Sequence, residues 1–439
     1  MTLYRGTFGA LSVFAASLWF GLPATSTPQD AVGPHGATPI DVQERRLDAL
    51  RIGDGSAVPR GVDPEMWKIH QPEDNATDAA RVALGRKLFF DARLSRDASV
   101  SCATCHDVAR GFGDARPASE GIDGQVGRRN APPTMNLFAV APAFWDGRSP
   151  TLEHQAIQPL INPIEMGMPS HDAVVAKLKD IPDYPPLFRA AYGREPNIAD
   201  TGRALAAFQR MLVFLDAPFD RWRAGVAEAL SDSERRGFAL YEGKARCATC
   251  HPLNASQPVG TDNLFHNTGV SADKRDFEKL VRKVLLALDY GNSTADVDHL
   301  ALATDMGELG RFVVTKRRHD IGAFRTPQVR NVAVTAPYMH DGSMATLWDV
   351  VDHYNKGGVD NPFLDGGIEA LALSETEIDD LVAFLFALTD DRLAGPKSTA
   401  RDAQYERSRK VRPFRDADAA ARRRSGFESQ VFGGKDDGK

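Results

Sequence analysis

The pentapeptide Cys102-Ala103-Thr104-Cys105-His106 recurs unchanged as Cys247-Ala248-Thr249-Cys250-His251. The two pentapeptides contain all 4 cysteines of the chain. In a CxxCH motif, two thiols can add to the vinyl groups of a porphyrin while the adjacent histidine coordinates its iron. The pattern therefore predicts two covalently bound haem c groups, one on each pentapeptide.

Three other uses of paired cysteines are less consistent with this pattern. A zinc site built from the four thiols would not require a histidine directly after each pair. A thioredoxin-like dithiol lies at a strand-to-helix turn of a βαβ unit, which neither flank resembles. Disulfide pairing would also leave the two histidines unexplained. We therefore favour haem attachment over zinc, dithiol and disulfide chemistry.

The first residues resemble an export signal. Arg5 gives a short positive region, residues 7–22 are apolar, and Pro23 to Ser26 form a small-residue exit. We interpret residues 1–24 as a signal peptide and leave open whether it is cleaved or kept as an anchor. No later run is apolar enough to span a bilayer. Because haem c is attached outside the cytoplasm, we expect the protein in the bacterial periplasm.

Composition allows two domains of ordinary size and gives no reason to expect a nucleic-acid partner. The net charge is -6 over 439 residues, without a large basic excess. Residues 25–75 are rich in Pro, Gly, Asp and Thr, and we interpret them as an extended N-terminal arm. Residues 396–439 combine many charges with few large apolar groups, which is typical of a poorly ordered tail.

Between these ends the apolar residues follow a helical period, so we predict a mainly α fold. The predicted helices are 78–90, 173–178, 201–215, 231–242 and 374–389, the last with a capping box of Ser374 and Glu377. A shared G-x-x-L-aromatic pattern, 85–89 and 237–241, precedes the two CxxCH motifs and indicates a duplicated helical haem domain. We predict two cytochrome c-like domains, an N-terminal one at 76–220 and a C-terminal one at 221–395.

What occupies the second face of each iron decides between electron transport and reaction with a small ligand. Two six-coordinate haems would make a carrier or redox sensor, whereas an open iron could bind peroxide. Most histidines outside the motifs are expected to be structural or exposed. They are His35, His70, His154, His171, His266, His299, His319, His340 and His353.

Four further blocks carry a family resemblance. They are Arg129-Asn130-Ala131-Pro132, Phe144-Trp145-Asp146-Gly147-Arg148, Asn162-Pro163-Ile164-Glu165-Met166-Gly167 and Pro337-Tyr338-Met339-His340-Asp341-Gly342. In this order, interleaved with both CxxCH motifs over residues 75–392, the blocks resemble the bacterial dihaem cytochrome c peroxidase and MauG family. The resemblance implies that the haem on His106 reacts with hydrogen peroxide. The haem on His251 would store and relay an oxidising equivalent.

Two departures from the peroxidase pattern place the chain closer to the MauG-like branch. The loop histidine that caps the first haem in peroxidases corresponds here to Ile122, and no histidine lies between His106 and His154. We therefore expect a five-coordinate first haem. At the second haem, Tyr354 stands where peroxidases have a methionine ligand. This tyrosine resembles the MauG branch, which implies that its phenolate ligates the iron on His251. Met339, Met344 and His353 remain competing ligands, with Met339 the strongest of the three.

The resemblance also assigns roles around the first haem and between the haems. Glu165 would move protons, Gln155 would donate a hydrogen bond, Pro159 would form a wall and Trp145 would bridge the two haems. Asn130 and the backbone carbonyls of Thr335 and Pro337 match the oxygen ligands of a calcium ion.

The sequence thus predicts a peroxide-reducing dihaem oxidoreductase whose electron donor is a cytochrome c or a small copper protein. MauG-like oxidation of a partner protein's side chains remains an alternative, although Ala245 stands where MauG has its relay tryptophan. The third possible function is that of an electron carrier or redox sensor that turns over no substrate. A homodimer is implied by the resemblance alone. Residues 271–308 look like an insertion that could carry a partner surface.

Overall fold

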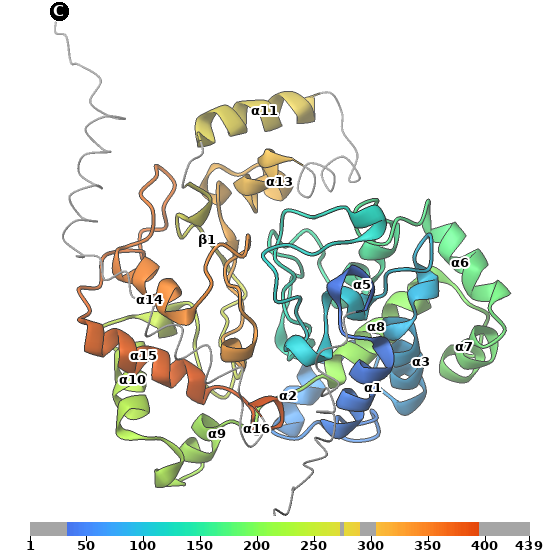
Figure 1. Ribbon diagram of the computed structural model, residues 1–439, viewed down its shortest axis with the longest axis horizontal. Helices are drawn as coiled ribbons and strands as arrows, with labels where there is room; N and C mark the ends of the chain where they lie inside the picture. The colour runs from blue at the N-terminus through green and yellow to red at the C-terminus, as the bar shows by residue number, and fades with distance from the viewer. Residues whose placement is uncertain (1–32, 273–275, 290–303, 395–439) are drawn as a thin grey trace, which may run out of the picture. The chain divides into compact units, whose positions relative to one another are not determined.

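The chain folds mainly into helices, as the apolar periodicity predicts. The computed structural model describes residues 33–272, 276–289 and 304–394, which belong to one structural unit (Figure 1). The predicted signal peptide, the tail and part of the 271–308 insertion lie outside the described residues. Among the described residues, no helix has the length and hydrophobicity needed to cross a membrane.

The helices of the first half are α1 (Ile40–Ala49), α2 (Pro64–Ile69), α3 (Ala79–Phe90), α4 (Cys102–Cys105), α5 (Leu152–Ile161), α6 (His171–Asp180), α7 (Tyr184–Tyr192) and α8 (Ile198–Met211). Those of the second half are α9 (Pro218–Arg223), α10 (Asp232–Glu242), α11 (Phe277–Asp289), α13 (Phe312–Thr315), α14 (Leu347–Asn355), α15 (Glu375–Ala387) and α16 (Asp391–Ala394). Strands β1 (Phe265–His266) and β2 (Phe324–Arg325) pair antiparallel, with Phe265 opposite Arg325.

The helix boundaries follow capping chemistry that is visible in the sequence. At the start of α15, the Ser374 amide donates to Glu377 Oε2 over 2.8 Å and the Glu377 amide donates to Ser374 Oγ over 3.3 Å. This exchange is the predicted capping box. Ser231 and Glu234 form the same exchange at the start of α10, and the Asp78 side chain caps α3 by accepting from the Arg81 amide. The five predicted helices are therefore confirmed as α3, α6, α8, α10 and α15, with small shifts at their ends.

Helix α3, which precedes the first CxxCH motif, crosses α8 at Gly85 (Figure 1). A Cβ atom on Gly85 would lie 1.9 Å from the carbonyl oxygen of Ala204 and 2.8 Å from Cβ of Phe208. One turn further along α3, the ring of Phe89 packs 5.2 Å from that of Phe208. Only a glycine lets the two backbones approach this closely.

Helix α10, which precedes the second motif, crosses α15 in the same manner. A Cβ atom on Gly237 would lie 1.9 Å from the carbonyl oxygen of Asp380 and 2.8 Å from Cβ of Phe384. The ring of Tyr241 lies 5.2 Å from that of Phe384, and its hydroxyl donates to the backbone carbonyl of His251. The shared G-x-x-L-aromatic pattern therefore marks one packing unit that the chain uses twice.

Each of these crossings belongs to its own hydrophobic cluster. The first cluster contains Phe89, Phe208 and Phe214, and the second contains Tyr241, Phe384 and Trp348. Apart from Val259, the first cluster ends at Leu215, and the second begins at Phe219. The mainly helical prediction is confirmed, and the two clusters support the proposed division near residue 220.

The prediction of an extended arm at 25–75 is wrong for the described part of that segment. Leu47 of α1 is fully buried and Trp67 of α2 is 9% exposed, and both belong to the first cluster. Gln43 donates to the Ala103 carbonyl over 3.1 Å and accepts from the Val108 amide over 3.0 Å, so α1 braces the first CxxCH motif. The prediction failed because α1 exposes most of its charged residues and buries only a narrow stripe.

The glycine crossings predict a strong effect of a single methyl group. Gly85→Ala should gain about 1 kcal/mol of helix propensity but lose more, because α3 and α8 must move apart. We expect a net destabilisation of about 2 kcal/mol or more, measured as a fall in the thermal unfolding midpoint of the holoprotein. Gly366→Ala is the matched control, because a Cβ there meets no atom within 4 Å. Equal unfolding midpoints for Gly85→Ala and wild type would refute the close-packing argument.

Candidate active site

A single cavity of about 410 Å³ joins the two CxxCH motifs. Cys105 and His106 line it from the first motif, and Cys247, Cys250 and His251 line it from the second. Its wall also includes the other predicted site residues, namely Asn130, Trp145, Gln155, Pro159, Glu165, Thr335, Pro337 and Tyr354. Cys102 is not part of the wall and packs against the first cluster instead. Residues from both halves of the chain therefore meet around one space.

The cysteines of both motifs carry free thiols. Burial raises the pKa of Cys102, Cys105 and Cys247 to about 12, so these groups are neutral at physiological pH. A thiol is the group that adds to a porphyrin vinyl carbon, so these residues fit the predicted haem attachment.

The two motif histidines are oriented alike. Nδ1 of His106 lies 3.3 Å from the Phe112 carbonyl oxygen, and Nδ1 of His251 lies 3.1 Å from the Gly260 carbonyl oxygen. A carbonyl only accepts, so each Nδ1 carries the proton and each Nε2 keeps a lone pair for a metal. Burial lowers the pKa of both imidazoles, which keeps them neutral. Both rings are therefore prepared to bind iron through Nε2.

The charge of a buried arginine in the cavity wall indicates whether the cavity fits haem. Arg325 is 6% exposed and lines the cavity, and burial lowers its pKa to about 10. Its guanidinium contacts the carbonyl oxygens of Phe144 and Thr326, at 3.4 and 3.2 Å, and has no carboxylate partner among the described residues. A buried cation without an anion is costly. The propionate groups of haem would supply that anion, so the lining fits the predicted cofactor.

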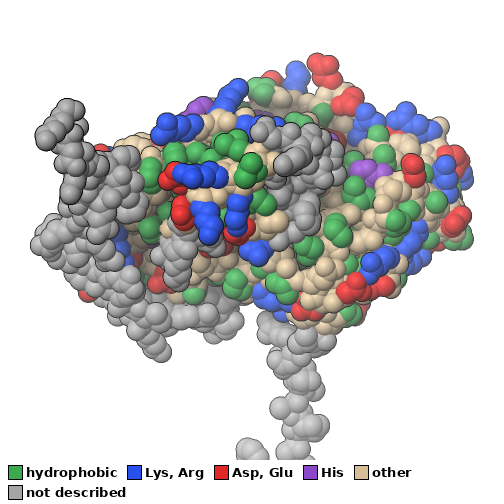
Figure 2. Space-filling model, turned by 90° about the horizontal axis from the view of Figure 1, so that it is seen from above, with side chains coloured by type: hydrophobic (Ala, Val, Ile, Leu, Met, Phe, Trp, Pro, Cys, Tyr) green, Lys and Arg blue, Asp and Glu red, His purple; other side chains and the backbone are tan. Residues whose placement is uncertain are grey.

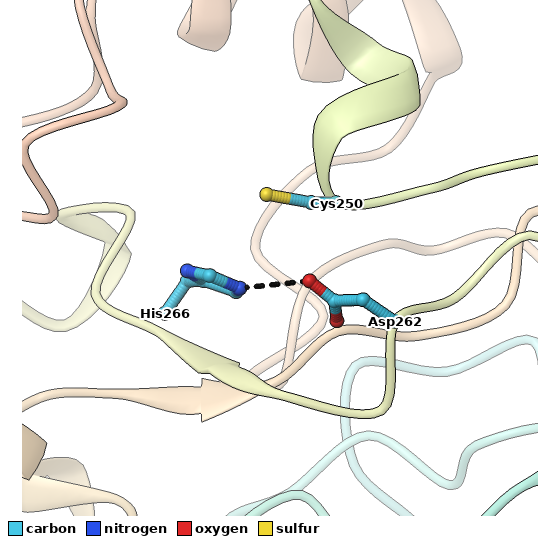
Figure 3. Close-up of side chains that lie close together, drawn as sticks. All are labelled: Cys250, Asp262 and His266. Atoms are coloured by element: carbon cyan, nitrogen blue, oxygen red, sulfur yellow. Dashed lines mark hydrogen bonds and ion pairs between the residues drawn. The ribbon is translucent and has the colours of Figure 1, made fainter.

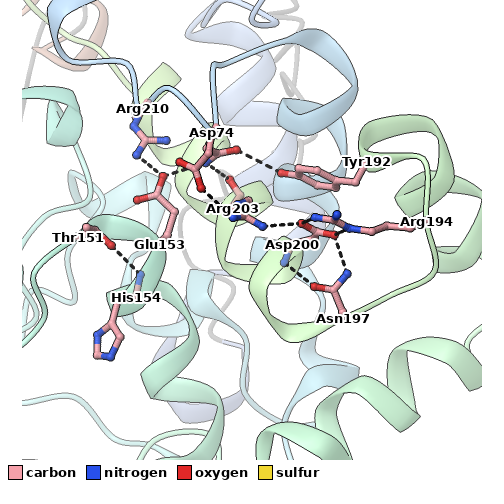
Figure 4. Close-up of polar contacts among 11 residues, drawn as sticks. Asp74, Thr151, Glu153, His154, Tyr192, Arg194, Asn197, Asp200, Arg203 and Arg210 are labelled. Carbon is pink, nitrogen blue, oxygen red and sulfur yellow. Dashed lines mark hydrogen bonds and ion pairs between the residues drawn. The ribbon is translucent and has the colours of Figure 1, made fainter.

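Helix α5 presents Gln155 and Pro159 to the cavity and is anchored on its opposite side. Glu153 pairs with Arg210 of α8 and accepts from Asn75 Nδ2 over 2.8 Å. Figure 4 shows how this contact continues into a network in which Arg203 binds Asp74 and Asp200, at 2.7 and 3.0 Å. These ion pairs fix the position of α5 and hence of the two cavity residues.

Glu165 lies near the first motif, held by a short loop. Asn162 Nδ2 donates to Glu165 Oε1 over 2.9 Å, and the Ile122 amide donates to the Glu165 carbonyl over 3.0 Å. The charge of Glu165 contributes to the raised pKa of both Cys102 and Cys105, which indicates its proximity to them. Ile122, which stands where peroxidases of the family carry their capping histidine, is fully buried against this loop.

Trp145 lies at the centre of the cavity wall. Its indole Nε1 donates to the Asn130 carbonyl over 2.9 Å, and its ring lies edge-on to His340 at 6.5 Å between centroids. His340 in turn stacks on Phe324 at 3.8 Å. The Asn130 side chain donates to the Arg116 carbonyl over 2.9 Å, and Asn130 lines the cavity together with Thr335 and Pro337.

A second internal repeat surrounds Trp145 and was not among the features predicted from the sequence. Residues 141–152 and 336–347 share the pattern A-P-x-x-x-D-G-x-x-x-T-L. Phe144 and Met339 adopt φ values of 67° and 72° at matching positions, and Gly147 and Gly342 follow with 66° and 64°. Each segment closes an antiparallel bridge, Ala143 with Ser149 and Tyr338 with Met344. Aligning the two segments would have revealed this repeat from sequence alone.

This alignment pairs residues that differ in chemistry. Trp145 corresponds to His340 and Arg129 corresponds to Phe324, and both pairs are in contact, with the Arg129 guanidinium 4.6 Å from the Phe324 ring centroid. Residues that contact their own counterparts lie at a local twofold axis. Continuing the alignment through α5 and α14 pairs Pro159 with Tyr354. The proline and the tyrosine therefore hold equivalent positions in the two halves.

Of the four candidate ligands for the second haem, two line the cavity, Tyr354 and Met339. His353 Nε2 bonds to the Thr268 carbonyl over 2.9 Å, which commits its ring to the backbone, and Met344 packs against the second cluster. Burial, followed by the nearby Cys250 and Cys247, raises the pKa of Tyr354. Its hydroxyl is therefore close to the second motif and is protonated unless a metal binds it.

A histidine between two carboxylates lies beside the second motif, and sequence reasoning gave it no role. His266 Nε2 lies 3.1 Å from Asp262 Oδ2, as Figure 3 shows, and its Nδ1 lies 2.6 Å from Asp365 Oδ2. Hydrogen bonds to Asp262, Cys250 and Asp365 raise the pKa of His266 to about 11. Asp262 lies four residues before His266, whereas Asp365 lies 99 residues after it, which explains why no local motif revealed the group. An imidazolium is thus held within the wall of the cavity.

The raised pKa of His266 predicts a pH-dependent contribution to stability. A group whose pKa rises on folding stabilises fully below its unfolded value, about 6.5, and this contribution is lost as the pH approaches the folded value. His266→Gln should therefore lower the free energy of unfolding more at about pH 6 than at about pH 10. Urea unfolding of both holoproteins at the two pH values measures this. A difference that does not change with pH would contradict the ion-pair assignment.

Comparison with known proteins agrees with this geometry. Residues 79–228 match the model of the family described as di-haem cytochrome c peroxidase. The chain is 42% identical over 325 residues to the methylamine utilization protein MauG of Methylorubrum extorquens, covering 73% of this chain and 81% of that protein. It is 36% identical over 346 residues to the cytochrome-c peroxidase IdrP1 of Denitromonas iodatirespirans, covering 77% and 88%.

A solved structure agrees as well. A MauG-like protein associated with microbial copper homeostasis superimposes with a TM-score of 0.63 at 32% identity, covering 79% of this chain and 98% of that one. The chain therefore belongs to the di-haem cytochrome c peroxidase and MauG family of oxidoreductases, whose members bind two haems.

Proposed function

We propose that this protein reduces hydrogen peroxide at the haem on His106 and draws the electrons, through the haem on His251, from an external donor. The observation that carries the proposal is the unequal pair of residues in the shared cavity. Pro159 has no side-chain group that could ligate iron, whereas its counterpart Tyr354 offers a phenol oxygen. The first site is therefore left open to a small ligand and the second is closed.

Peroxide reduction consumes two electrons and two protons, breaks one O–O bond and releases two water molecules. Haem iron, when bound, supplies the centre that accepts the peroxide and passes electrons to it. The residues around it must then supply and place the protons.

Glu165 is the group that we assign to proton transfer. The near oxygen of peroxide must lose a proton and the leaving oxygen must gain one, and a carboxylate within reach of both can do this. Asn162 Nδ2 donates to Glu165 Oε1 over 2.9 Å, which fixes the carboxylate in the wall of the cavity. Gln155 lines the same wall and can donate its amide to a bound oxygen.

Trp145 is the residue that we assign to electron transfer between the halves. Its ring lies in the cavity wall next to His340, and an indole can be oxidised and reduced without moving. The second site, with His251 and Tyr354 as ligands, would store one oxidising equivalent. An anionic oxygen ligand favours the oxidised iron, which suits a store of this kind.

Three accompanying assignments complete the proposal. A calcium ion bound by Asn130 and by the carbonyls of Thr335 and Pro337 would fix the segments that carry Trp145 and His340, since all three offer hard oxygen ligands. Residues 1–24 would direct the protein to the periplasm. There, a cytochrome c or a small copper protein would donate the electrons, and the protein would act as a homodimer.

MauG-like oxidation of a partner protein's side chains is the second candidate. Its support is the 42% identity to a protein named MauG and the tyrosine at position 354. Against it, Ala245 stands where that branch has its relay tryptophan, and Ala245 is 5% exposed. Peroxide reduction with an external donor therefore remains the better supported function.

The test is peroxide-dependent oxidation of a reduced cytochrome c or copper protein by the holoprotein. Glu165→Gln should lower kcat/KM for peroxide by about 10² to 10⁴, the range typical of a lost general acid or base, while haem content stays unchanged. Glu120→Gln is the control, because Glu120 lies outside the cavity wall and pairs with His35 and Arg116. Full activity of Glu165→Gln would refute the assignment of Glu165 to proton transfer. Donor oxidation no faster than without the enzyme would refute the proposed function.

A further inference from the structure

Helix α11 lies in the insertion and has two apolar sides. Phe277, Leu280 and Val284 are buried in a small cluster of their own, which is completed by residues of α13 and its neighbours. Leu285 and Leu286 point away from this cluster and are 47% and 63% exposed. The packing of the inner side leaves these two adjacent leucines available for contact with another protein.

A basic turn lies beside the start of this helix. Lys316, Arg317, Arg318 and His319 are consecutive and exposed. The Arg318 guanidinium lies 5.9 Å from the ring of Phe363, which in turn lies 6.5 Å from the ring of Phe277 at the beginning of α11. Lys316 and Arg317 have no carboxylate partner among the described residues. Figure 2, seen from the α11 side, shows hydrophobic and Lys or Arg side chains next to one another.

The local charge is opposite to that of the whole chain, whose net charge is -6. On α11, Lys279 adds a further exposed cation, and Arg282 and Lys283 pair with Glu278 and Asp305. Unpaired surface cations gain little for the fold itself. Their field does attract an acidic protein and orient it before contact.

Hydrogen bonds at both ends of the segment that contains α11 connect it to residues at the cavity. Ser271, before α11, donates to Glu308 Oε2 over 2.7 Å, and Glu308 lies 3.0 Å from Nε2 of the buried His340. Arg311, just before α13, donates to the carbonyls of Asp146 and Gly147 at 3.0 and 2.7 Å, next to Trp145. A partner bound to α11 would therefore lie on a support that is hydrogen-bonded to the residues between the haem sites.

We propose that Leu285 and Leu286 of α11, with the basic turn 316–319, form the docking face for an acidic redox protein that donates electrons. This inference rests on the proposed function, because it identifies the kind of donor which that function requires. The leucines would supply the apolar centre of a small, transient interface, and the basic turn would supply its charged rim. Because this rim is positively charged, we expect an acidic partner.

The experiment compares two reduced donors, a strongly acidic cytochrome c and a strongly basic one, with the full-length holoprotein. Arg317→Glu/Arg318→Glu and Leu286→Asp should each raise KM for the acidic donor by about tenfold or more. They should leave kcat with the neutral reductant hydroquinone unchanged. For wild type, the advantage of the acidic donor should shrink as ionic strength rises from about 0.02 to about 0.2 M.

Matched controls separate this face from general surface effects. Arg51→Glu/Lys68→Glu and Ile69→Asp make the same changes at exposed positions on the first half of the chain, where Ile69 is 72% exposed. They should leave KM for the acidic donor unchanged. Equal losses in test and control variants, or no loss in the test variants, would overturn the docking face.

Binding of the acidic cytochrome c, followed by broadening of its NMR signals, tests the face independently of turnover. Broadening that is lost in Arg317→Glu/Arg318→Glu and kept in the controls supports docking even if peroxide turnover fails, which would count against the proposed function alone. A change from dimer to monomer in Leu286→Asp with unchanged donor binding would show that a second copy of the chain covers this face and would refute the proposal.

Discussion

The structure depends on two helix crossings at backbone contact distance. At Gly85 and at Gly237 the helix that leads into a CxxCH motif approaches a later helix so closely that a Cβ would lie 1.9 Å from a carbonyl oxygen. Each crossing fixes where the motif emerges from its cluster. The motif histidine then bonds through Nδ1 to a carbonyl in the following loop, and its Nε2 is left for iron. Two copies of this unit, brought together around one cavity, give a protein with two metal centres.

Duplication alone would give two equal centres, and the differences arise at a few paired positions. Trp145 and His340 contact each other across the local axis, but only the indole is suited to carry an electron between the halves. Pro159 and Tyr354 occupy equivalent positions and differ in whether they can bind iron. Ile122, which the family resemblance places where peroxidases have their capping histidine, is buried. In the proposed function, these differences leave the framework intact and separate a site for peroxide from a site for storage.

Much of the fold and of the candidate site could be predicted because its signals are local. The CxxCH motifs, the capping boxes and the helical periodicity each depend on residues a few positions apart. The family blocks contain Glu165 and Trp145, and Tyr354 follows from its spacing relative to the last block. What could not be predicted depends on contacts between distant segments. His266 gains its second carboxylate from Asp365, 99 residues further along the chain. Gln43 reaches the first motif from a helix with too few apolar residues to indicate burial.

The electron paramagnetic resonance spectrum of the oxidised protein tests whether the two equal motifs have become one open and one closed haem site. We expect one high-spin and one low-spin ferric signal in equal amounts, with the low-spin signal lost in Tyr354→Phe. Two low-spin signals in the wild type would contradict it, as would a low-spin signal that persists unchanged in Tyr354→Phe.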